Sequence, residues 1–140
     1  MKRFLIIILC IPLIFFAKDE TRLALVIGNA NYDKGPLNNP VNDALLVKET
    51  LDSLGFDVIL DTNISNKNGF IEKVVEFGDK REDYDVAFVY YAGHAIQVGS
   101  ENYLLPTKVD FKRETDVRIK GFSVQDIMMY LSSMSNKVNV

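Results

Sequence analysis

Short apolar runs alternate with amphipathic segments along most of this chain. Apolar-rich runs at Leu23–Ile27, Phe56–Leu60 and Val86–Tyr91 predict three strands, and the first is wholly aliphatic, as expected of a strand buried on both faces. Between these runs, apolar residues at helical spacing predict helices over 40–54 and 70–77. This alternation is typical of an α/β domain with a mostly parallel sheet and helices on both faces.

The first predicted helix has recognisable ends. Asn39 is expected to cap it, Pro40 suits the first helical position, and Gly55 suits the residue after the end. Its core-facing side is expected to contain one polar residue, Lys48, beside these apolar ones: Val41, Ala44, Leu45, Leu51 and Leu54.

Three more elements are predicted after the third strand. Two half-apolar pieces within 95–105 flank a polar turn at Gly99–Asn102, which indicates a hairpin. Ser123 and Asp126 have the spacing of a capping box and predict the start of a third helix. Val138–Val140 has the character of the opening of a fourth core strand.

Residues 1–17 differ from the rest of the chain. Lys2 and Arg3 precede an uncharged apolar run at 4–16, and a small residue at 17 then comes before a charged stretch. This layout predicts a secretory signal peptide and therefore a secreted or periplasmic protein. The run is short for a transmembrane helix, but Phe15 stands where the cleavage site prefers a small residue. An uncleaved membrane anchor formed by residues 4–16 is therefore the alternative.

The composition argues against several classes of function. The net charge is −3 and no basic stripe is present, so nucleic acid is not an expected partner. Cys10, the only cysteine, lies in the predicted signal segment, so residues 18–140 offer no disulfide, zinc cluster or thiol. Neither G-x-G-x-x-G nor a P-loop sequence occurs, and the carboxylates from Asp79 to Asp85 lack metal-loop spacing. We therefore expect no cofactor and no metal.

Two side chains are candidates for chemistry. His94, the only histidine, follows the third strand, at the edge of an open α/β sheet where ligands bind. It can exchange a proton near neutral pH, but a loop histidine without a special role fits the position equally well. Asp43 lies early in the first helix, where its charge also suits the helix dipole, and spacing alone favours that structural role. Three polar residues after the first strand reach the same edge: Asn29, Asn31 and Tyr32.

Five short motifs stand in order along the chain. They are RLALVIGNANY (22–32), PLNNPVNDA (36–44), LGFDV (54–58), VYYAGHA (89–95) and NYLLP (102–106). Together they resemble the bacterial caspase-like and metacaspase peptidases, from about Arg22 to Val140, and YYAGH after a buried strand is the most specific part. The resemblance implies a caspase-like (caspase-hemoglobinase) fold and cysteine-type endopeptidase activity on protein or peptide substrates.

The resemblance also assigns roles to single residues. His94 matches the catalytic histidine, which holds the cysteine as a thiolate and protonates the leaving amine. The backbone N–H of Ala95 would contribute to the oxyanion hole. The family usually has glycine there, and alanine would add roughly 1 kcal/mol of strain if the position needed a positive φ. Asp43 matches the acidic residue that lines the P1 pocket in metacaspase-like members. Leu37–Asn39 contains no arginine of the kind that binds P1 aspartate in animal caspases, so Arg or Lys is expected at P1.

In caspases the nucleophilic cysteine follows the histidine by about 50 residues, which is near position 144 here. We therefore expect residues 21–140 to form a partial catalytic domain, truncated before the nucleophile strand and inactive alone. Two alternatives are a non-catalytic peptide-binding module around Asp43 and His94, and a degenerate fragment that folds poorly because its sheet is open. Calcium dependence, self-processing and assembly occur in parts of the family and have no signature in these residues.

Overall fold

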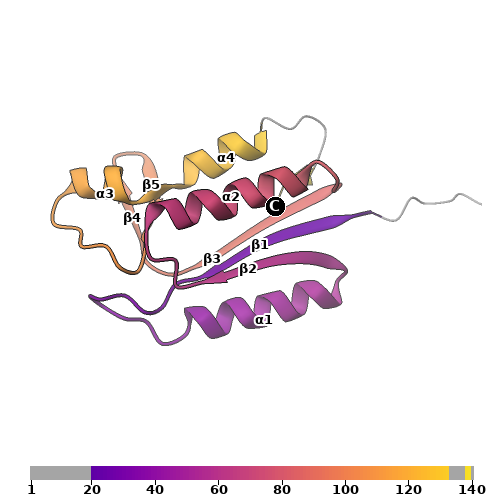
Figure 1. The fold of residues 1–140 in the computed structure, drawn as a ribbon, viewed down its shortest axis with the longest axis horizontal. Helices are drawn as coiled ribbons and strands as arrows, with labels where there is room; N and C mark the ends of the chain where they lie inside the picture. The colour runs from indigo at the N-terminus through magenta and orange to yellow at the C-terminus, as the bar shows by residue number, and fades with distance from the viewer. Residues whose placement is uncertain (1–19, 133–137, 140) are drawn as a thin grey trace, which may run out of the picture.

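A computed structural model of the protein describes residues 20–132 and 138–139. The three predicted strands and the first two predicted helices are all present (Figure 1). In chain order the elements are β1 (Arg22–Gly28), α1 (Pro40–Ser53), β2 (Phe56–Thr62), α2 (Lys67–Arg81), β3 (Val86–Ala92), β4 (Ala95–Val98), β5 (Glu101–Leu104), α3 (Glu114–Lys120), β6 (Phe122–Ser123), α4 (Val124–Ser132) and β7 (Val138–Asn139).

The larger sheet is parallel, with the order β2-β1-β3-β7. β1 pairs with both neighbours along its whole length, so Gly28 lies opposite Thr62 on one side and Ala92 on the other. Parallel strands need long crossovers, and α1 supplies the one from β1 to β2 and α2 the one from β2 to β3. β7 pairs with Val86 and Ala87, which confirms the predicted fourth strand at Val138–Asn139.

Alternate side chains of β1 enter two different cores. Leu23, Leu25 and Ile27 pack in the core shared with α2 and α4, whereas Ala24 and Val26 pack in the core shared with α1. Figure 1 shows the same layering, with α1 on one side of the sheet and α2 and α4 on the other. The predicted sheet covered on both faces is therefore confirmed.

Phe70 of α2 lies between the larger sheet and β6, and its ring contacts both. Its side chain is fully buried, and its ring stacks on Phe122 of β6 with centroids 5.4 Å apart and planes 3° from parallel. The ring of Tyr91 in β3 lies 6.2 Å away on a tilt. Aromatic contacts of this kind add to the free energy gained by burying the rings themselves.

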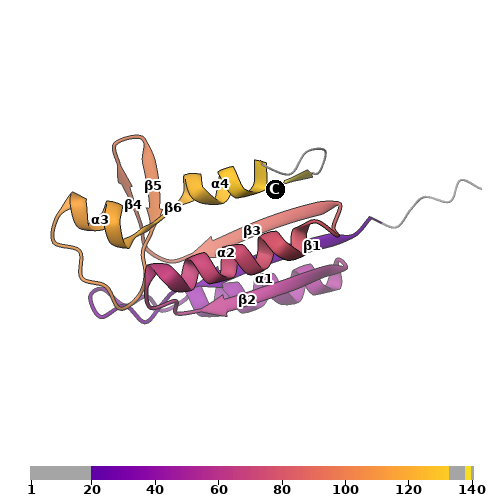
Figure 2. The ribbon, with the colours of Figure 1, turned by 45° about the horizontal axis from the view of Figure 1, so that its top comes forward.

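A smaller antiparallel sheet has the order β4-β5-β6 and projects beside the carboxyl edge of the larger one (Figure 2). β4 and β5 form the predicted hairpin, with Gly99 and Ser100 as its turn. Val98 and Tyr103 of the hairpin pack with Val117 of α3 in a third core.

The helix ends differ in detail from the prediction. Asn39 precedes α1, but its backbone is already near helical values (φ −103°, ψ −26°) and its side chain makes no capping hydrogen bond. A side-chain cap instead occurs at α2, where Asn66 Oδ1 accepts from the N–H of Gly69 at 3.1 Å. Leu45 and Leu54, predicted on the core face of α1, are 48% and 56% exposed, so the buried face is narrower than expected.

Two features of the helices had no counterpart in the prediction. α2 continues beyond Phe77 through charged residues to Arg81. α3 has few apolar residues, and its start is fixed by the carboxylate of Asp116, which accepts the N–H groups of Lys112 and Arg113 at 3.0 and 3.2 Å. At the start of α4, Ser123 Oγ accepts the N–H of Gln125 at 3.1 Å, one residue earlier than Asp126, the partner that the predicted capping box requires.

The predictions for residues 1–17, including Cys10 and the signal segment, lie outside the described residues. Across the part of the chain that the structure describes, no helix combines the length and apolar character that a membrane span requires.

Because Phe70 is fully buried and stacked, Phe70→Ala is expected to lower the free energy of unfolding by about 3–5 kcal/mol, measured by urea denaturation. The neighbouring Ile71 is 41% exposed, so Ile71→Ala serves as the matched control and should have a much smaller effect. Equal losses from the two variants would contradict the packing described above.

Candidate functional site

His94 lies two residues after the end of β3, at the carboxyl edge of the parallel sheet. β1 ends at the same level, because Gly28 pairs with Ala92. The loop at 29–39 that follows β1 therefore passes beside the histidine. His94 Nε2 lies 2.6 Å from the backbone carbonyl oxygen of Gly35 in that loop.

This contact determines which nitrogen of His94 carries the proton. A carbonyl oxygen can accept a hydrogen bond but cannot donate one, so Nε2 has to be the N–H donor. In a neutral imidazole, Nδ1 then holds the lone pair that can take up a proton. The Gly35 carbonyl thus orients the ring and makes Nδ1 its basic atom.

Two tyrosine hydroxyls hold the main chain of His94. The His94 N–H donates to Tyr32 Oη at 2.8 Å, and Tyr91 Oη donates to the His94 carbonyl at 2.9 Å. The two hydroxyls lie 3.0 Å apart and hydrogen-bond to each other. Burial and the bond to Tyr32 raise the pKa of Tyr91, so its hydroxyl stays a donor at physiological pH.

Gly93 is required by the tyrosines rather than by the sheet. A Cβ at this position would stand 2.5 Å from Tyr91 Oη and 2.6 Å from Tyr32 Oη, both inside contact distance. Any larger residue would therefore displace the hydroxyls that hold His94. The ring of Tyr32 also packs against the imidazole, with centroids 4.4 Å apart and planes tilted by 53°.

Gly35 is a glycine for a different reason. Its φ is +70°, in the left-handed region that side chains disfavour. The residue in this conformation is the one whose carbonyl oxygen accepts the hydrogen bond from His94 Nε2.

Ala95, in the position where glycine was expected, is the first residue of β4 and lies opposite Leu104. Among the described residues other than glycine, only Asn63 has a positive φ. The left-handed strain considered for Ala95 is therefore absent.

A cavity of about 350 Å³ opens beside His94. One wall comes from the loop after β1 and the other from the segment that follows β5. Its lining residues are Tyr32, Asp33, Lys34, His94, Leu105, Thr107, Lys108, Val109, Asp110 and Phe111. Such a volume lies within the range of small-molecule and side-chain pockets.

Asp43 is not among the residues that line this cavity. It lies exposed in the first turn of α1, where a carboxylate favours the positive end of the helix dipole. The structure therefore brings His94 together with Tyr32 and Gly35, whereas Asp43 is an exposed residue that does not line the cavity. Across the described residues, no group of three or more His, Cys, Asp or Glu side chains is placed to hold a metal ion.

Asn29 has a structural role that its turn-forming character did not reveal. It is fully buried at the end of β1, where its Oδ1 accepts from the N–H of Ile64 at 2.9 Å and its Nδ2 donates to the Leu105 carbonyl at 3.2 Å. The signal in the sequence is an amide side chain directly after a fully apolar strand. The Gly35 carbonyl had no such signal, because it is a backbone atom.

Comparison with known proteins agrees with the geometry. A search of curated proteins gave no match to this chain. A family model described as a caspase domain matches residues 21–138, which is most of the chain. The α/β layering, the parallel sheet and the histidine-bearing edge are consistent with that match. The chain therefore belongs to the caspase-domain family of cysteine peptidases, and its fold is caspase-like.

Proposed function

We propose that this protein is part of a caspase-like cysteine endopeptidase, in which His94 is the catalytic histidine and acts as general base and general acid. The observation that carries the proposal is the 2.6 Å contact between His94 Nε2 and the Gly35 carbonyl. It leaves Nδ1 as the basic nitrogen of a ring held at the carboxyl edge of the sheet, beside a cavity.

The nucleophile in this proposal comes from outside the 140 residues, since none of residues 18–140 is a cysteine. The register of β7 indicates where it would stand. Val138 pairs with Val86 and Asn139 with Ala87, so a strand continued in this register puts a residue at about position 144 beside Ala92. That is two residues before His94, and it agrees with the family spacing between histidine and cysteine.

The proposed reaction follows from these positions. His94 Nδ1 takes the thiol proton, and the thiolate attacks the carbonyl carbon of the scissile peptide bond. The N–H of Ala95 stabilises the oxyanion that forms. The C–N bond then breaks as the imidazolium returns its proton to the leaving amine, and water hydrolyses the thioester.

We further propose a preference for Arg or Lys at P1, with Asp43 as the residue that attracts the basic side chain. The proposal rests on the family motif at 36–44 and on the exposed carboxylate of Asp43. Because Asp43 lies outside the cavity beside His94, the P1 side chain would have to run toward the start of α1.

The role of His94 is tested in a form of the protein that carries a cysteine at about position 144 on a continued β7. His94→Ala should lower kcat/KM for peptides with Arg or Lys at P1 by at least about 100-fold, because proton transfer is lost. Gln97→Ala, on an exposed position of β4, is the control and should retain the activity. Retained cleavage in His94→Ala would refute the assignment. The 140-residue chain alone should show no thiol-dependent cleavage.

The P1 preference is tested with paired substrates that differ only in Arg or Asp at P1. Asp43→Asn should lower kcat/KM for the Arg substrate by about 10-fold or more, through loss of a charge-assisted contact. Glu49→Gln, an exposed carboxylate on the same helix, is the control for a general change in surface charge. A preference for Asp over Arg in the unmutated protein would exclude the proposed specificity.

A further inference from the structure

Two ion pairs connect the loop after β1 to the segment after β5. Lys34 Nζ lies 2.8 Å from Asp110 Oδ1, and Lys108 Nζ lies 2.6 Å from Asp33 Oδ1. The pairs are formed by consecutive residues of the loop, one acidic and one basic, and they lie directly before Gly35. A backbone hydrogen bond from the N–H of Asp33 to the Thr107 carbonyl, at 3.2 Å, joins the same two segments.

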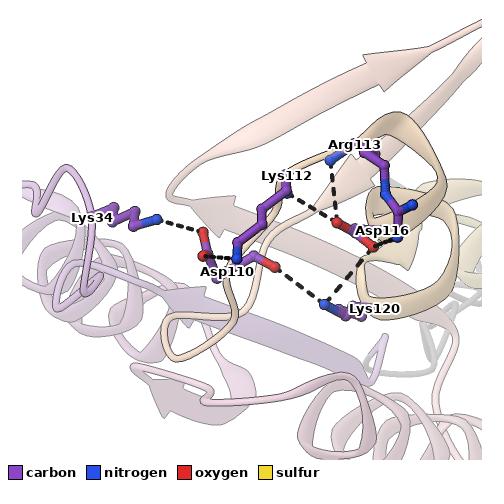
Figure 3. A network of polar contacts seen from close by, with 6 residues as sticks. All are labelled: Lys34, Asp110, Lys112, Arg113, Asp116 and Lys120. Carbon is purple, nitrogen blue, oxygen red and sulfur yellow. Dashed lines mark hydrogen bonds and ion pairs between the residues drawn. The ribbon is translucent and has the colours of Figure 1, made fainter.

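Asp110 is the centre of a cluster of lysine side chains. Figure 3 shows Lys34 approaching it from one side and Lys112 and Lys120 from the other. Lys112 Nζ is 3.9 Å from its carboxylate, and Lys120 Nζ donates to its backbone carbonyl at 3.3 Å. The hydrogen bond from Lys34, together with the nearby lysine charges, lowers the pKa of Asp110. The carboxylate is therefore ionised whenever the protein is near neutral pH.

The two ion pairs lie next to the residue that contacts the imidazole of His94. The residue after Lys34 is Gly35, whose carbonyl oxygen accepts the hydrogen bond from His94 Nε2. The main chain of His94 is held by two tyrosine hydroxyls, whereas its ring is held by that carbonyl and by packing against the ring of Tyr32. A shift confined to Asp33–Gly35 would lengthen this hydrogen bond, while Tyr91 of β3 still holds the His94 carbonyl.

We propose that the ion pairs Lys34–Asp110 and Asp33–Lys108 form a clamp that holds the Gly35 carbonyl against His94 Nε2. The four residues are positioning residues, because they act on the imidazole through the loop. The clamp deepens the proposed function, since it sets how much of the time His94 presents Nδ1 as its base. It makes that fraction sensitive to ionic strength.

The size of the effect follows from the exposure of the pairs. The side chains of Lys34 and Asp110 are 77% and 42% exposed, and those of Lys108 and Asp33 are 52% and 65% exposed. Pairs this exposed are individually weak and screened by salt. Loss of one pair should therefore change the population of the released ring by about two- to fivefold.

The experiment follows the Nε2 proton of His94 directly, in the full 140-residue chain labelled with ¹⁵N-histidine. His94 is the only histidine, so its imidazole signals need no assignment by mutagenesis. The exchange rate of the Nε2 proton with water, measured by NMR at about pH 8, reports how often the bond to Gly35 opens. Asp110→Asn and Asp33→Lys should each raise this rate about two- to fivefold.

Two comparisons separate the clamp from a general loss of structure. The double variant Asp33→Lys with Lys108→Asp places two lysines on the loop opposite two carboxylates, and should return the rate to within about twofold of the unmutated value. Lys80→Met removes an ion pair of similar exposure on α2, with Glu76 at 3.1 Å, and should leave the rate unchanged. Raising the salt from about 0.01 M to about 1 M should speed exchange in the unmutated chain, because the Debye length falls about tenfold.

Three results would overturn the proposal: no protected Nε2 proton in the unmutated chain, unchanged exchange in Asp110→Asn and Asp33→Lys, or a failure of the charge swap to restore protection. None of these measurements requires peptide cleavage. A completed protein that cleaves no peptide, but in which the charge variants speed exchange, would reject the proposed peptidase function and leave the clamp supported.

Discussion

The pairing of β1 with β2 and β3 is the constraint on which the rest of the structure depends. β1 is hydrogen-bonded on both sides along its full length, and its side chains enter two cores. Because β1 and β3 are parallel and in register, their last residues, Gly28 and Ala92, lie at the same level. The two chain segments that leave the sheet there have to pass each other. The contact between Gly35 and His94 is a consequence of that geometry.

The polar side chains at the carboxyl edge of the sheet form hydrogen bonds with each other and with the backbone. Unpaired buried hydroxyls and amides carry a large free-energy penalty, so each has to find a partner. Tyr32 and Tyr91 do so with the main chain of His94, and Asn29 with the backbone at Ile64 and Leu105. The site is therefore positioned by the same hydrogen bonds that make the end of the sheet stable.

The sequence predicts most of the larger sheet and the place of His94, because apolar runs and the YYAGH motif are local signals. It did not predict α3, whose few apolar residues leave a weak helical pattern and whose start depends on a carboxylate reaching back to Lys112 and Arg113. Contacts such as Lys34–Asp110 join residues 76 positions apart and leave no local pattern. The Gly35 carbonyl has no sequence signature, because every residue carries one. The proposed role of Asp43 rests on the motif, because its position in the first turn of α1 by itself favours an interaction with the helix dipole.

The backbone and the ring of His94 are held by interactions of different kinds. Its N–H and carbonyl are bound to two tyrosine hydroxyls in partly buried hydrogen bonds between groups without a net charge, which salt screens little. Its ring is bound to a carbonyl on a surface loop, next to ion pairs that water and salt can reach. Perturbation of the surface should therefore alter the orientation of the imidazole before it alters the fold. A histidine arranged in this way keeps a fixed place at the sheet edge, while the availability of its basic nitrogen follows the state of the loop.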